Sequence, residues 1–471
     1  MRNQIALSCL PLFLCTIAHA QDQDIDPNAL YQQHCAQCHG VNLEGGNAQS
    51  MLNGIWLHGE GMGYVSRNIK HGITYLGMPA YENVLSDPEI RAITGFILSA
   101  ERAAGVEKPP PPESGQSLDY EFKVDVWVED VEIPWDIAWL DDSTALITER
   151  PGGVRVVKDG VLLPDPIANT PEVLHEGQGG MMAVAVDPEY DENGWVYLGY
   201  THALADGDRR PNAMTKIVRG KIENHAWTNE EVVFEAPHET YLSGRIHYGV
   251  RIVFDEAGYL YFAIGERGMQ HHAQELERPN GKVHRVHRDG RIPEDNPFVG
   301  VDGAIKSIYS YGNRNPQGLS FDPNTGLLWS AEHGPMGGDE LNVIRSGRNY
   351  GWPEITYGRN YNGTLVSDET HRDGMEQPAW YWNPSTAVCG IAFYEGEQFP
   401  LWEGKLLVSA LRNEQVSLVS VYEDRVIHEE IILRAIGRVR HAAPGPDGAV
   451  YVLTNSPDQV LRVSVIRKRG Y

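Results

Sequence analysis

One pattern recurs six times after residue 120, and it constrains the fold more than any other feature of this sequence. Each copy is an acidic or glycine-containing turn followed by a short apolar strand, and helical periodicity nearly vanishes in this part of the chain. Residues 120–471 divide into six units of about 59 residues, enough for four strands each. We therefore expect an all-β six-bladed β-propeller; a pair of β-sandwiches with similar turns is the alternative. The copies begin at Asp141, Asp191, Asp255, Asp322, Glu403 and Asp447.

Residues 21–100 differ in character and carry the motif Cys35-Ala36-Gln37-Cys38-His39. Two cysteines three apart followed at once by histidine are the signature of covalent c-type haem attachment. Cys35 and Cys38 would form thioethers with the haem vinyl groups, and His39 would be the proximal iron ligand. A CxxC redox pair or half of a zinc site is the alternative, but the sequence has no second CxxC. We expect a small all-α domain that resembles class I cytochromes c.

The helices and the sixth iron ligand of this domain can be predicted from local signals. Pro27 to Gln37 has an N-terminal proline and good helix formers, and Ser86 is the candidate N-cap of a helix that runs through Ser99. Met78, in the loop Gly77-Met78-Pro79, is the best candidate for the sixth ligand, and a thioether there would raise the reduction potential. The competing side chains are Met51, His58, Met62 and His71.

The amino-terminal segment predicts export. Arg2 precedes an apolar run from Ile5 to Ile17 that ends in Ala18-His19-Ala20, the pattern of a secretory signal cleaved after Ala20. A lipobox at Cys15 is disfavoured because Leu14 is too bulky. The run is too short to span a bilayer, and no later stretch approaches eighteen apolar residues. We expect a periplasmic protein, which agrees with haem c attachment outside the cytoplasm.

The predicted boundaries are a signal peptide at 1–20, a cytochrome c domain at 21–100, a linker at 101–119 and the propeller at 120–471. The linker contains four prolines, 109–112, followed by Glu-Ser-Gly-Gln-Ser, which indicates a polyproline spacer with a flexible end. After cleavage and haem attachment only Cys389 remains, so no internal disulfide is expected. The formal net charge of -25 argues against nucleic acid or an anionic membrane as partner.

Polar residues that no strand pattern explains gather between the repeated units. In a propeller such connections converge on one end of the central channel, so they can share a site. A haem moves one electron at a time, so the propeller is expected to perform the oxidation that supplies electrons. His247 could act as a base there, although a single histidine is more often structural. The segments are Gly177–Gly180, Arg245–Arg251, Tyr311–Gly318, Glu332–Glu340 and Arg438–His441.

A hydride acceptor is also needed, and the sequence has no GxGxxG after a strand to hold a nicotinamide or flavin. An anionic quinone would fit the surplus of arginine in these connections. The arginines are Arg314, Arg412, Arg438 and Arg440.

Seven stretches in the same order resemble the soluble pyrroloquinoline-quinone (PQQ) sugar dehydrogenases, the glucose/sorbosone dehydrogenase family. They span nearly all of residues 120–471. The resemblance implies a six-bladed propeller and oxidation of aldose sugars at the anomeric carbon, with electrons leaving through the haem to another cytochrome or a terminal oxidase. The stretches are Ile133–Trp139, Thr148–Gly152, Gly177–Gly180, His247–Arg251, Tyr311–Gly318, Glu332–Pro335 and Asn349–Pro353.

The resemblance also implies roles for single residues. His247 would be the general base and Arg314 would lie by the reactive quinone carbonyl, with Gln178 at the sugar end of the pocket. Calcium would bridge cofactor and protein through the carbonyls of Gly334 and Pro335, since oxygen ligands suit this cation. Glu340 and Tyr350 resemble a second, structural calcium site. The residues that would hold the cofactor are Asn315, Arg412, Arg438 and Arg440.

Three positions depart from the family pattern. Arg412 stands where the best-known glucose enzyme of the family has lysine, Glu266 replaces an expected aspartate, and His441 follows Arg440 where aspartate is common. These departures bear on substrate identity more than on reaction class.

Three other functions remain to be weighed against sugar oxidation. One is a non-catalytic, haem-carrying propeller used for binding. A denitrification enzyme would need a longer, eight-bladed domain, and quinohaemoprotein alcohol dehydrogenases have a larger propeller with the cytochrome usually behind it.

Overall fold

The computed structural model describes residues 25–54, 56, 62–74, 77–105, 110–204 and 210–470, with only the backbone given for 62–64. The predicted signal peptide and its cleavage site lie outside the described residues. The chain divides into two compact units, one helical and one β-rich. In the described residues no helix is long and apolar enough to cross a membrane.

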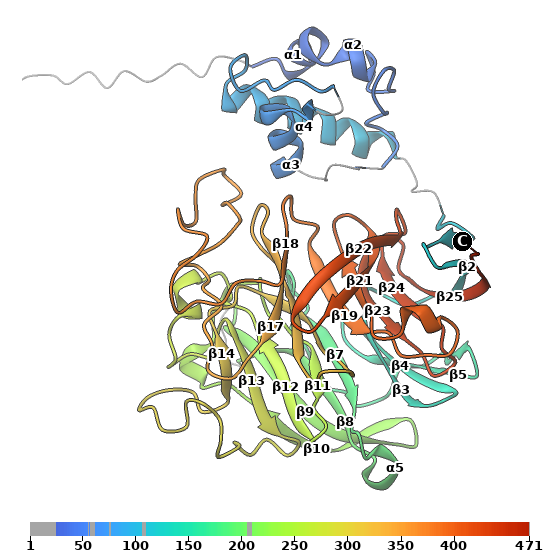
Figure 1. Cartoon of the computed structure of the whole chain (residues 1–471), viewed down its shortest axis with the longest axis vertical. Coiled ribbons are helices and arrows are strands. Elements are labelled where there is room, and N and C mark those ends of the chain that lie inside the picture. The colour runs from blue at the N-terminus through green and yellow to red at the C-terminus, as the bar shows by residue number, and fades with distance from the viewer. Residues whose placement is uncertain are drawn as a thin grey trace, which may run out of the picture. The chain divides into compact units, whose positions relative to one another are not determined.

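The helical unit contains α1 (Pro27–His34), α2 (Ala36–His39), α3 (Met62–His71) and α4 (Asp87–Ala104) (Figure 1). Asp26 caps α1 by accepting hydrogen bonds from two main-chain amides. The predicted cap of α4 is confirmed, because the Ser86 amide and hydroxyl both donate to Glu89, at 2.8 and 2.7 Å. α4 packs against α1, where the ring centroids of Tyr31 and Phe96 are 5.6 Å apart.

The predicted helix 27–37 is interrupted at Cys35, which is a difference from the sequence prediction. Cys35 has φ −119°, outside the helical range, so α1 ends at His34. A new set of hydrogen bonds then begins at the Cys35 carbonyl, which accepts from the amides of Cys38 and His39 at 3.1 and 3.0 Å. The haem motif therefore forms its own tight turn, α2.

The β-rich unit is a propeller of six sheets, which confirms the predicted fold class. In five blades four consecutive strands pair antiparallel. They are β3–β6 (Pro134–Asp141, Thr144–Glu149, Val154–Lys158, Val161–Leu162), β7–β10 (Met181–Val186, Val196–Ala203, Ala213–Glu223, Ala226–Phe234), β11–β14 (Ile252–Phe254, Tyr259–Ile264, Lys282–His287, Ile308–Tyr311), β15–β18 (Pro316–Phe321, Leu328–Glu332, Asp339–Ile344, Trp380–Trp382) and β19–β22 (Val388–Phe393, Leu406–Ala410, Gln415–Tyr422, Arg425–Leu433). Short helices in the connections are α5 (Tyr190–Asn193), η2 (His238–Thr240), η3 (Gln270–Ala273) and η4 (Pro400–Trp402).

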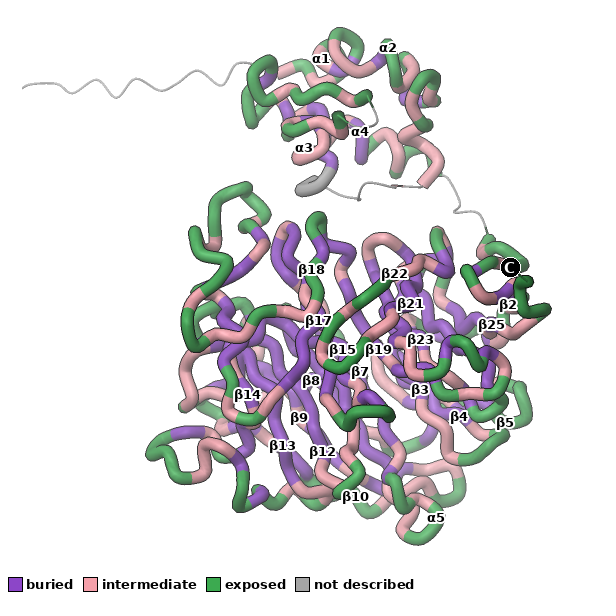
Figure 2. Tube along the Cα trace, in the orientation of Figure 1, coloured by how far each residue is buried: buried purple, intermediate pink, exposed green. Residues whose placement is uncertain are grey.

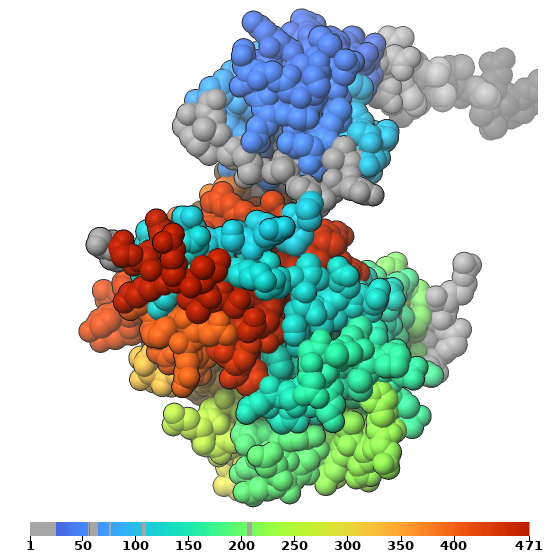
Figure 3. Space-filling view, turned by 90° about the vertical axis from the view of Figure 1, so that its right-hand side faces the viewer, coloured from blue at the N-terminus to red at the C-terminus, as the bar shows by residue number. Residues whose placement is uncertain are grey.

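The sixth blade joins the two ends of the propeller sequence. β23 (Arg438–Pro444), β24 (Val450–Asn455) and β25 (Gln459–Lys468) come from the C-terminus, and β2 (Tyr120–Val128) pairs antiparallel with β25. Figure 3 shows these cyan and red segments side by side. Because both ends of the propeller sequence lie in one sheet, main-chain hydrogen bonds hold the ring of blades closed.

The predicted linker 101–119 differs from the structure at both ends. α4 continues through Ala104, and Ser114–Gln116 forms β1, which pairs with β2. The segment expected to be a flexible end is ordered because the edge of the closing blade offers it unpaired main-chain groups.

Each of the six repeated turns joins the first strand of a blade to the second. Aspartate carboxylates close several of them; Asp255 accepts from the Tyr259 amide at 2.8 Å and Asp322 from the Asn324 amide at 2.9 Å. In the second copy Asp187, rather than Asp191, accepts from the Glu189 amide, because α5 is inserted in this turn. The recurring pattern therefore marks one defined connection per blade.

Burial concentrates on the inner and middle strands of the blades (Figure 2). Between the closing blade and its neighbour, Tyr120 and Phe122 of β2 pack edge-on against Trp402, with ring centroids 5.8 and 6.0 Å apart. All three side chains are nearly inaccessible to solvent. The ring is thus closed by apolar packing as well as by main-chain hydrogen bonds.

We expect Phe122→Ala to destabilise the propeller by about 3–5 kcal/mol, because it leaves a cavity in the closing blade. Val126→Ala in the same strand is the matched control; Val126 is 43% exposed, so its change should cost about 0.5 kcal/mol or less. Chemical denaturation followed by tryptophan fluorescence measures both. Equal midpoints for the two variants would contradict a stabilising role for the β2 closure.

Candidate functional site

The predicted site residues of the propeller lie in or next to the connections at one end of the blades. Consecutive strands run in opposite directions, so connections between the second and third strands and those between blades emerge together. Gln178, His247 and Arg314 precede the inner strands of three blades, and Arg438 begins the inner strand of the sixth. Glu266, Gly334 and Arg412 follow the second strands of three blades. Residues far apart in sequence therefore meet around the central axis.

His247 forms a buried pair with Glu266. Its Nδ1 lies 2.5 Å from Glu266 Oε1, which leaves Nε2 for a substrate proton. Burial, followed by the nearby charge of Arg314, lowers the pKa of His247 below its usual 6.5. A neutral imidazole oriented by a carboxylate is the arrangement that a general base requires. The departure at Glu266 is thus accommodated, since the longer carboxylate reaches the imidazole.

The backbone around His247 is held by two other predicted site residues. The His247 amide donates to Gln178 Oε1 at 2.8 Å, and the Gly249 amide donates to Asn315 Oδ1 at 3.2 Å. His247 itself has φ +56°, a left-handed conformation that these contacts stabilise. Gln178 and Asn315 therefore hold the backbone around His247 in this structure.

Arg314 is fixed by the loop that follows β16. Its Nη1 donates to the carbonyls of His333 and Gly334, at 2.9 and 2.8 Å, and its amide donates to Glu332 at 2.6 Å. The guanidinium lies 5.3 Å from the Trp352 ring. Asp339 holds the loop from the other side by accepting from the Gly334 amide at 2.8 Å.

Positive charge dominates the centre of the site. Arg150, Arg314, Arg438 and Arg440 make no ion pair with the carboxylates of the residues described here. Burial lowers the pKa of Arg440 to about 10, and its guanidinium stacks 4.4 Å from the Trp135 ring. Such a surplus of unneutralised cations favours an anionic ligand.

Several buried donors in the same region are unsatisfied within the described part of the chain. A ligand rich in oxygen acceptors would satisfy such groups, which otherwise cost free energy when buried. The site therefore fits a planar, anionic quinone such as PQQ. The unsatisfied atoms are Arg150 Nε, Arg314 Nε, Asn315 Nδ2 and His333 Nε2.

His333 and Arg150 were not predicted as site residues. Burial and the charges of Arg314, His247, Arg440 and Arg438 lower the pKa of His333 well below 6.5, which places its ring among residues from three blades. Arg150 lies near Arg438, whose charge contributes to lowering the pKa of Arg150 after burial. Both residues stand inside the motifs Glu332–Pro335 and Thr148–Gly152, so the signal was present in the sequence.

Two buried carboxylates face each other beside Arg314. Glu332 and Glu340 are paired across β16 and β17, and Asn342 Nδ2 donates to both, at 3.0 and 3.1 Å. Burial raises the pKa of each, and the charge of Glu332 raises that of Glu340 further. Both residues line a cavity together with Arg314, His333, Gly334, Gly338, Tyr350, Trp352, Ile355 and Thr356.

This cavity bears on the predicted calcium ligands, because Gly334, Glu340 and Tyr350 all border it. The Tyr350 hydroxyl donates to the Val343 carbonyl at 2.6 Å and accepts from the Arg345 amide, so the main-chain carbonyl of Tyr350 is its better candidate for a ligand atom. Pro335 lies in the adjoining loop. Oxygen ligands around two carboxylates fit a hard divalent cation.

The other two departures have different surroundings. The His441 ring is buried with Nε2 3.8 Å from Asp136 Oδ1, and Asp136 also pairs with Arg251. His441 thus joins a polar network at the inner strands. The Arg412 amide donates to the Thr386 carbonyl at 3.1 Å, which ties its turn to the connection between β18 and β19.

In the helical unit, the haem motif and the Met78 loop are connected through Tyr81. The Tyr81 hydroxyl donates to the His34 carbonyl at 2.6 Å, and burial and the charges of Cys35 and Cys38 raise the pKa of Tyr81. Met78 forms an isolated antiparallel bridge with Ile73.

The environment of His39 suits a metal ligand, because burial lowers the pKa of its ring and favours the neutral form. Of the competing sixth ligands, His71 is engaged with Glu82 at 3.2 Å on the surface. His58 lies outside the described residues.

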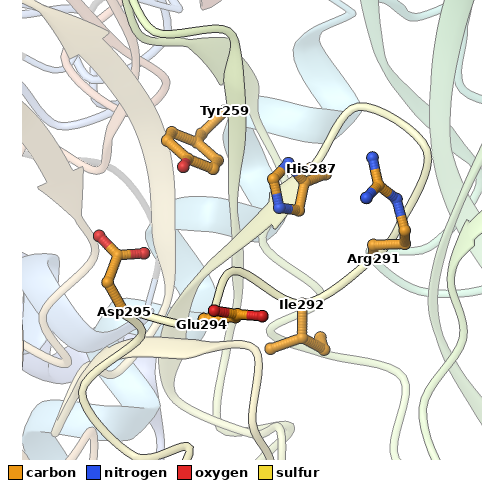
Figure 4. Close-up of a pocket in the computed structure, with 6 residues that line it drawn as sticks. All are labelled: Tyr259, His287, Arg291, Ile292, Glu294 and Asp295. Carbon is orange, nitrogen blue, oxygen red and sulfur yellow. The ribbon is translucent and has the colours of Figure 1, made fainter.

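A further pocket lies at the opposite end of the propeller (Figure 4). Tyr259 begins β12 next to the first-to-second-strand turn, and the lining continues into the segment after β13. It is separate from the residues described above. The lining residues are Tyr259, His287, Arg291, Ile292, Glu294 and Asp295.

Comparisons with known proteins agree with this site. The family model for Glucose / Sorbosone dehydrogenase matches residues 131–463, and that for Cytochrome C oxidase, cbb3-type, subunit III matches residues 23–97. Aldose sugar dehydrogenase YliI of Escherichia coli (strain K12) is 39% identical over 348 residues, 72% of this chain and 92% of that protein.

Two other similarities concern the cofactors. The PQQ-bound form of an aldose sugar dehydrogenase from Streptomyces coelicolor has a TM-score of 0.60 at 26% identity, covering 75% of this chain and 99% of that one. Cbb3-type cytochrome c oxidase subunit CcoP of Rhodobacter capsulatus is 49% identical over 83 residues, which are 15% of this chain and 28% of that protein.

The fold and the site together define an oxidoreductase of the PQQ-dependent sugar dehydrogenase class. The chain belongs to the glucose/sorbosone dehydrogenase family, and it carries an N-terminal cytochrome c domain of the cbb3 type.

The His247–Glu266 pair predicts a pH profile. The predicted role of His247 as general base requires its neutral form, so activity should fall as pH decreases through its pKa, and the acid limb of kcat/KM should lie below pH 6.5. Glu266 raises that pKa, so Glu266→Gln should move the limb to still lower pH while lowering kcat at least about tenfold. Glu239→Gln, at an exposed position, is the control. If the acid limb of kcat/KM does not move in Glu266→Gln, Glu266 does not determine the pKa of His247.

Proposed function

We propose that this chain is a periplasmic quinohaemoprotein that oxidises aldose sugars at the anomeric carbon and passes the electrons to its own haem c. The observation that carries the proposal is the buried His247–Glu266 pair beside an arginine cluster without carboxylate partners. A base and an anion site at one point are what removal of a hydroxyl proton, coupled to hydride loss to a quinone, requires.

The propeller residues would divide the chemistry as follows. His247 accepts the proton of the anomeric hydroxyl, and Glu266 stabilises the imidazolium that forms. Arg314 would lie beside the cofactor's reactive carbonyl, and Asn315, Arg412, Arg438 and Arg440 would hold the cofactor. Gln178 positions the sugar. PQQ, when bound, supplies the carbon that accepts the hydride.

One calcium ion would be held by the carbonyls of Gly334 and Pro335, next to the cofactor. Glu340 and the Tyr350 carbonyl would hold a second, structural calcium ion. The facing carboxylates of Glu332 and Glu340 support this assignment, because a divalent cation offsets the repulsion between them. When bound, calcium supplies a Lewis acid for the quinone oxygen.

The helical unit would hold haem c through Cys35 and Cys38, with His39 and Met78 as axial ligands. The connection through Tyr81 supports Met78, because it ties the segment after this loop to the attachment motif. The haem supplies one-electron transfer, and another cytochrome or a terminal oxidase would receive the electrons. We place the domains at 21–100 and 120–471, with the signal peptide removed after Ala20.

Reconstitution tests this function. With PQQ and Ca2+ present, an aldose should reduce the haem of the full chain, and the haem absorbance reports it; a chelator in place of Ca2+ should abolish the reaction. His247→Ala should lower the rate about 100-fold or more, whereas His238→Ala, at an exposed site on η2, should not change it.

Two outcomes would contradict the proposal in different ways. No haem reduction and no PQQ uptake across a broad sugar panel would indicate a non-catalytic binding module. A variant without haem, Cys35→Ala/Cys38→Ala, separates the steps, because it should still reduce an artificial dye with sugar. Loss of dye reduction there would mean that the propeller does not oxidise the sugar by itself.

Met78 can be tested independently of sugar oxidation. Met78→Ala should remove the thioether ligand, lower the reduction potential and alter the haem spectrum. Met51→Ala is the matched control and should leave both unchanged. Redox titration monitored by absorbance measures the potential. An unchanged potential in Met78→Ala would rule this residue out as the axial ligand.

A further inference from the structure

The connection between β12 and β13 carries a group of side chains of metal-ligating type, separate from the residues to which calcium is assigned above. Ligand atoms of His271, His272 and Glu275 all lie within 4.8 Å of one another, and His271 Nε2 is 3.8 Å from Glu275 Oε1. The two imidazole rings are 4.6 Å apart at 67°. We propose that these three residues bind a divalent transition-metal ion, with Zn2+ as the representative ion.

His272 supplies an independent observation in favour of this site. It is only 4% exposed, and its Nδ1 is buried without a hydrogen-bond partner among the described residues. A buried ring nitrogen left unpaired costs free energy, which metal coordination would offset. His271 and Glu275 are more exposed and can close around an ion by changes of rotamer.

The backbone that carries these ligands is held firmly. Lys282 Nζ donates to the carbonyls of His272, Ala273 and Asn280, at 2.9, 3.0 and 2.6 Å. On the other side, Gln274 donates to the Trp352 carbonyl at 2.7 Å. A preorganised loop reduces the entropy lost when the ion binds.

The two oxygens of Glu275 are already divided between two roles. Oε1 faces His271, whereas Oε2 pairs with Arg278 Nε at 3.0 Å. Arg278 can therefore stay bound to the carboxylate while the other oxygen coordinates the ion, as outer-shell partners of metal ligands commonly do.

The donor set decides which ion fits. Two imidazole nitrogens and one carboxylate suit Zn2+, Cu2+ or Ni2+, whereas Ca2+ and Mg2+ prefer all-oxygen sites. In a tetrahedral zinc site bond lengths of about 2.0–2.1 Å place ligand atoms about 3.3 Å apart. The observed separations, which are 4.8 Å or less, would have to contract toward this value, and rotamer changes of the exposed His271 and Glu275 side chains supply that movement. Water or an added ligand would complete the coordination.

Isothermal titration of the full, haem-containing chain with ZnCl2, in excess Ca2+, tests this proposal. We expect His271→Ala and Glu275→Gln each to lose one zinc equivalent or to weaken it at least tenfold. His238→Ala, which removes an exposed histidine near Glu235, should keep the wild-type stoichiometry and affinity. Identical zinc isotherms for the wild type, His271→Ala and Glu275→Gln would overturn the proposal.

A thermal measurement adds a second criterion that does not depend on activity. Zn2+ should raise the melting temperature of the wild type and of His238→Ala, because an ion that binds only the folded state stabilises it. The increase should be smaller in His271→Ala and Glu275→Gln. An equal increase in all four proteins would assign the effect to other zinc ligands and overturn the site. Circular dichroism and haem absorbance establish that each variant folds.

Discussion

The pairing of β2 with β25 is the constraint on which the propeller depends. The blades contribute inner strands around one axis, and this arrangement persists only if the ring is closed. The closure uses main-chain hydrogen bonds along β2 and the packing of Tyr120 and Phe122 on Trp402. Because the ring is closed, connections from separate blades keep fixed positions relative to one another, and a site made from several of them can be geometrically defined.

The site uses that geometry to combine groups that would be unfavourable alone. His247 comes from one connection, Glu266 from the next, and Arg314 from a third. Burial lowers the pKa of the His247 imidazole and favours its neutral form, while Arg150, Arg314, Arg438 and Arg440 form no ion pair with a carboxylate of the described residues. Confined cations of this kind are stabilised when an anion binds among them. The connections that hold His247 therefore also carry the positive charge that favours binding of an anionic cofactor.

Local sequence signals were sufficient for several elements. The Ser86 cap and the six turns were predicted because each depends on contacts within a few residues, such as Ser86 with Glu89 and Asp255 with Tyr259. The break at Cys35 and the strand Ser114–Gln116 were not predicted. Cys35 changes the chain direction inside a helix-favouring stretch, and Ser114–Gln116 becomes a strand only because β2 presents a free edge.

The sequence by itself determined the class of this protein, because the haem motif and the ordered propeller motifs are local patterns with chemical meaning. It also named His247, Arg314 and Arg440 by resemblance. Only the tertiary structure decided that Glu266 is the partner of His247, that His333 lies among the arginines, and that Glu332 faces Glu340. These relations join residues on different strands or blades, so they depend on ring closure and burial, which no local pattern encodes.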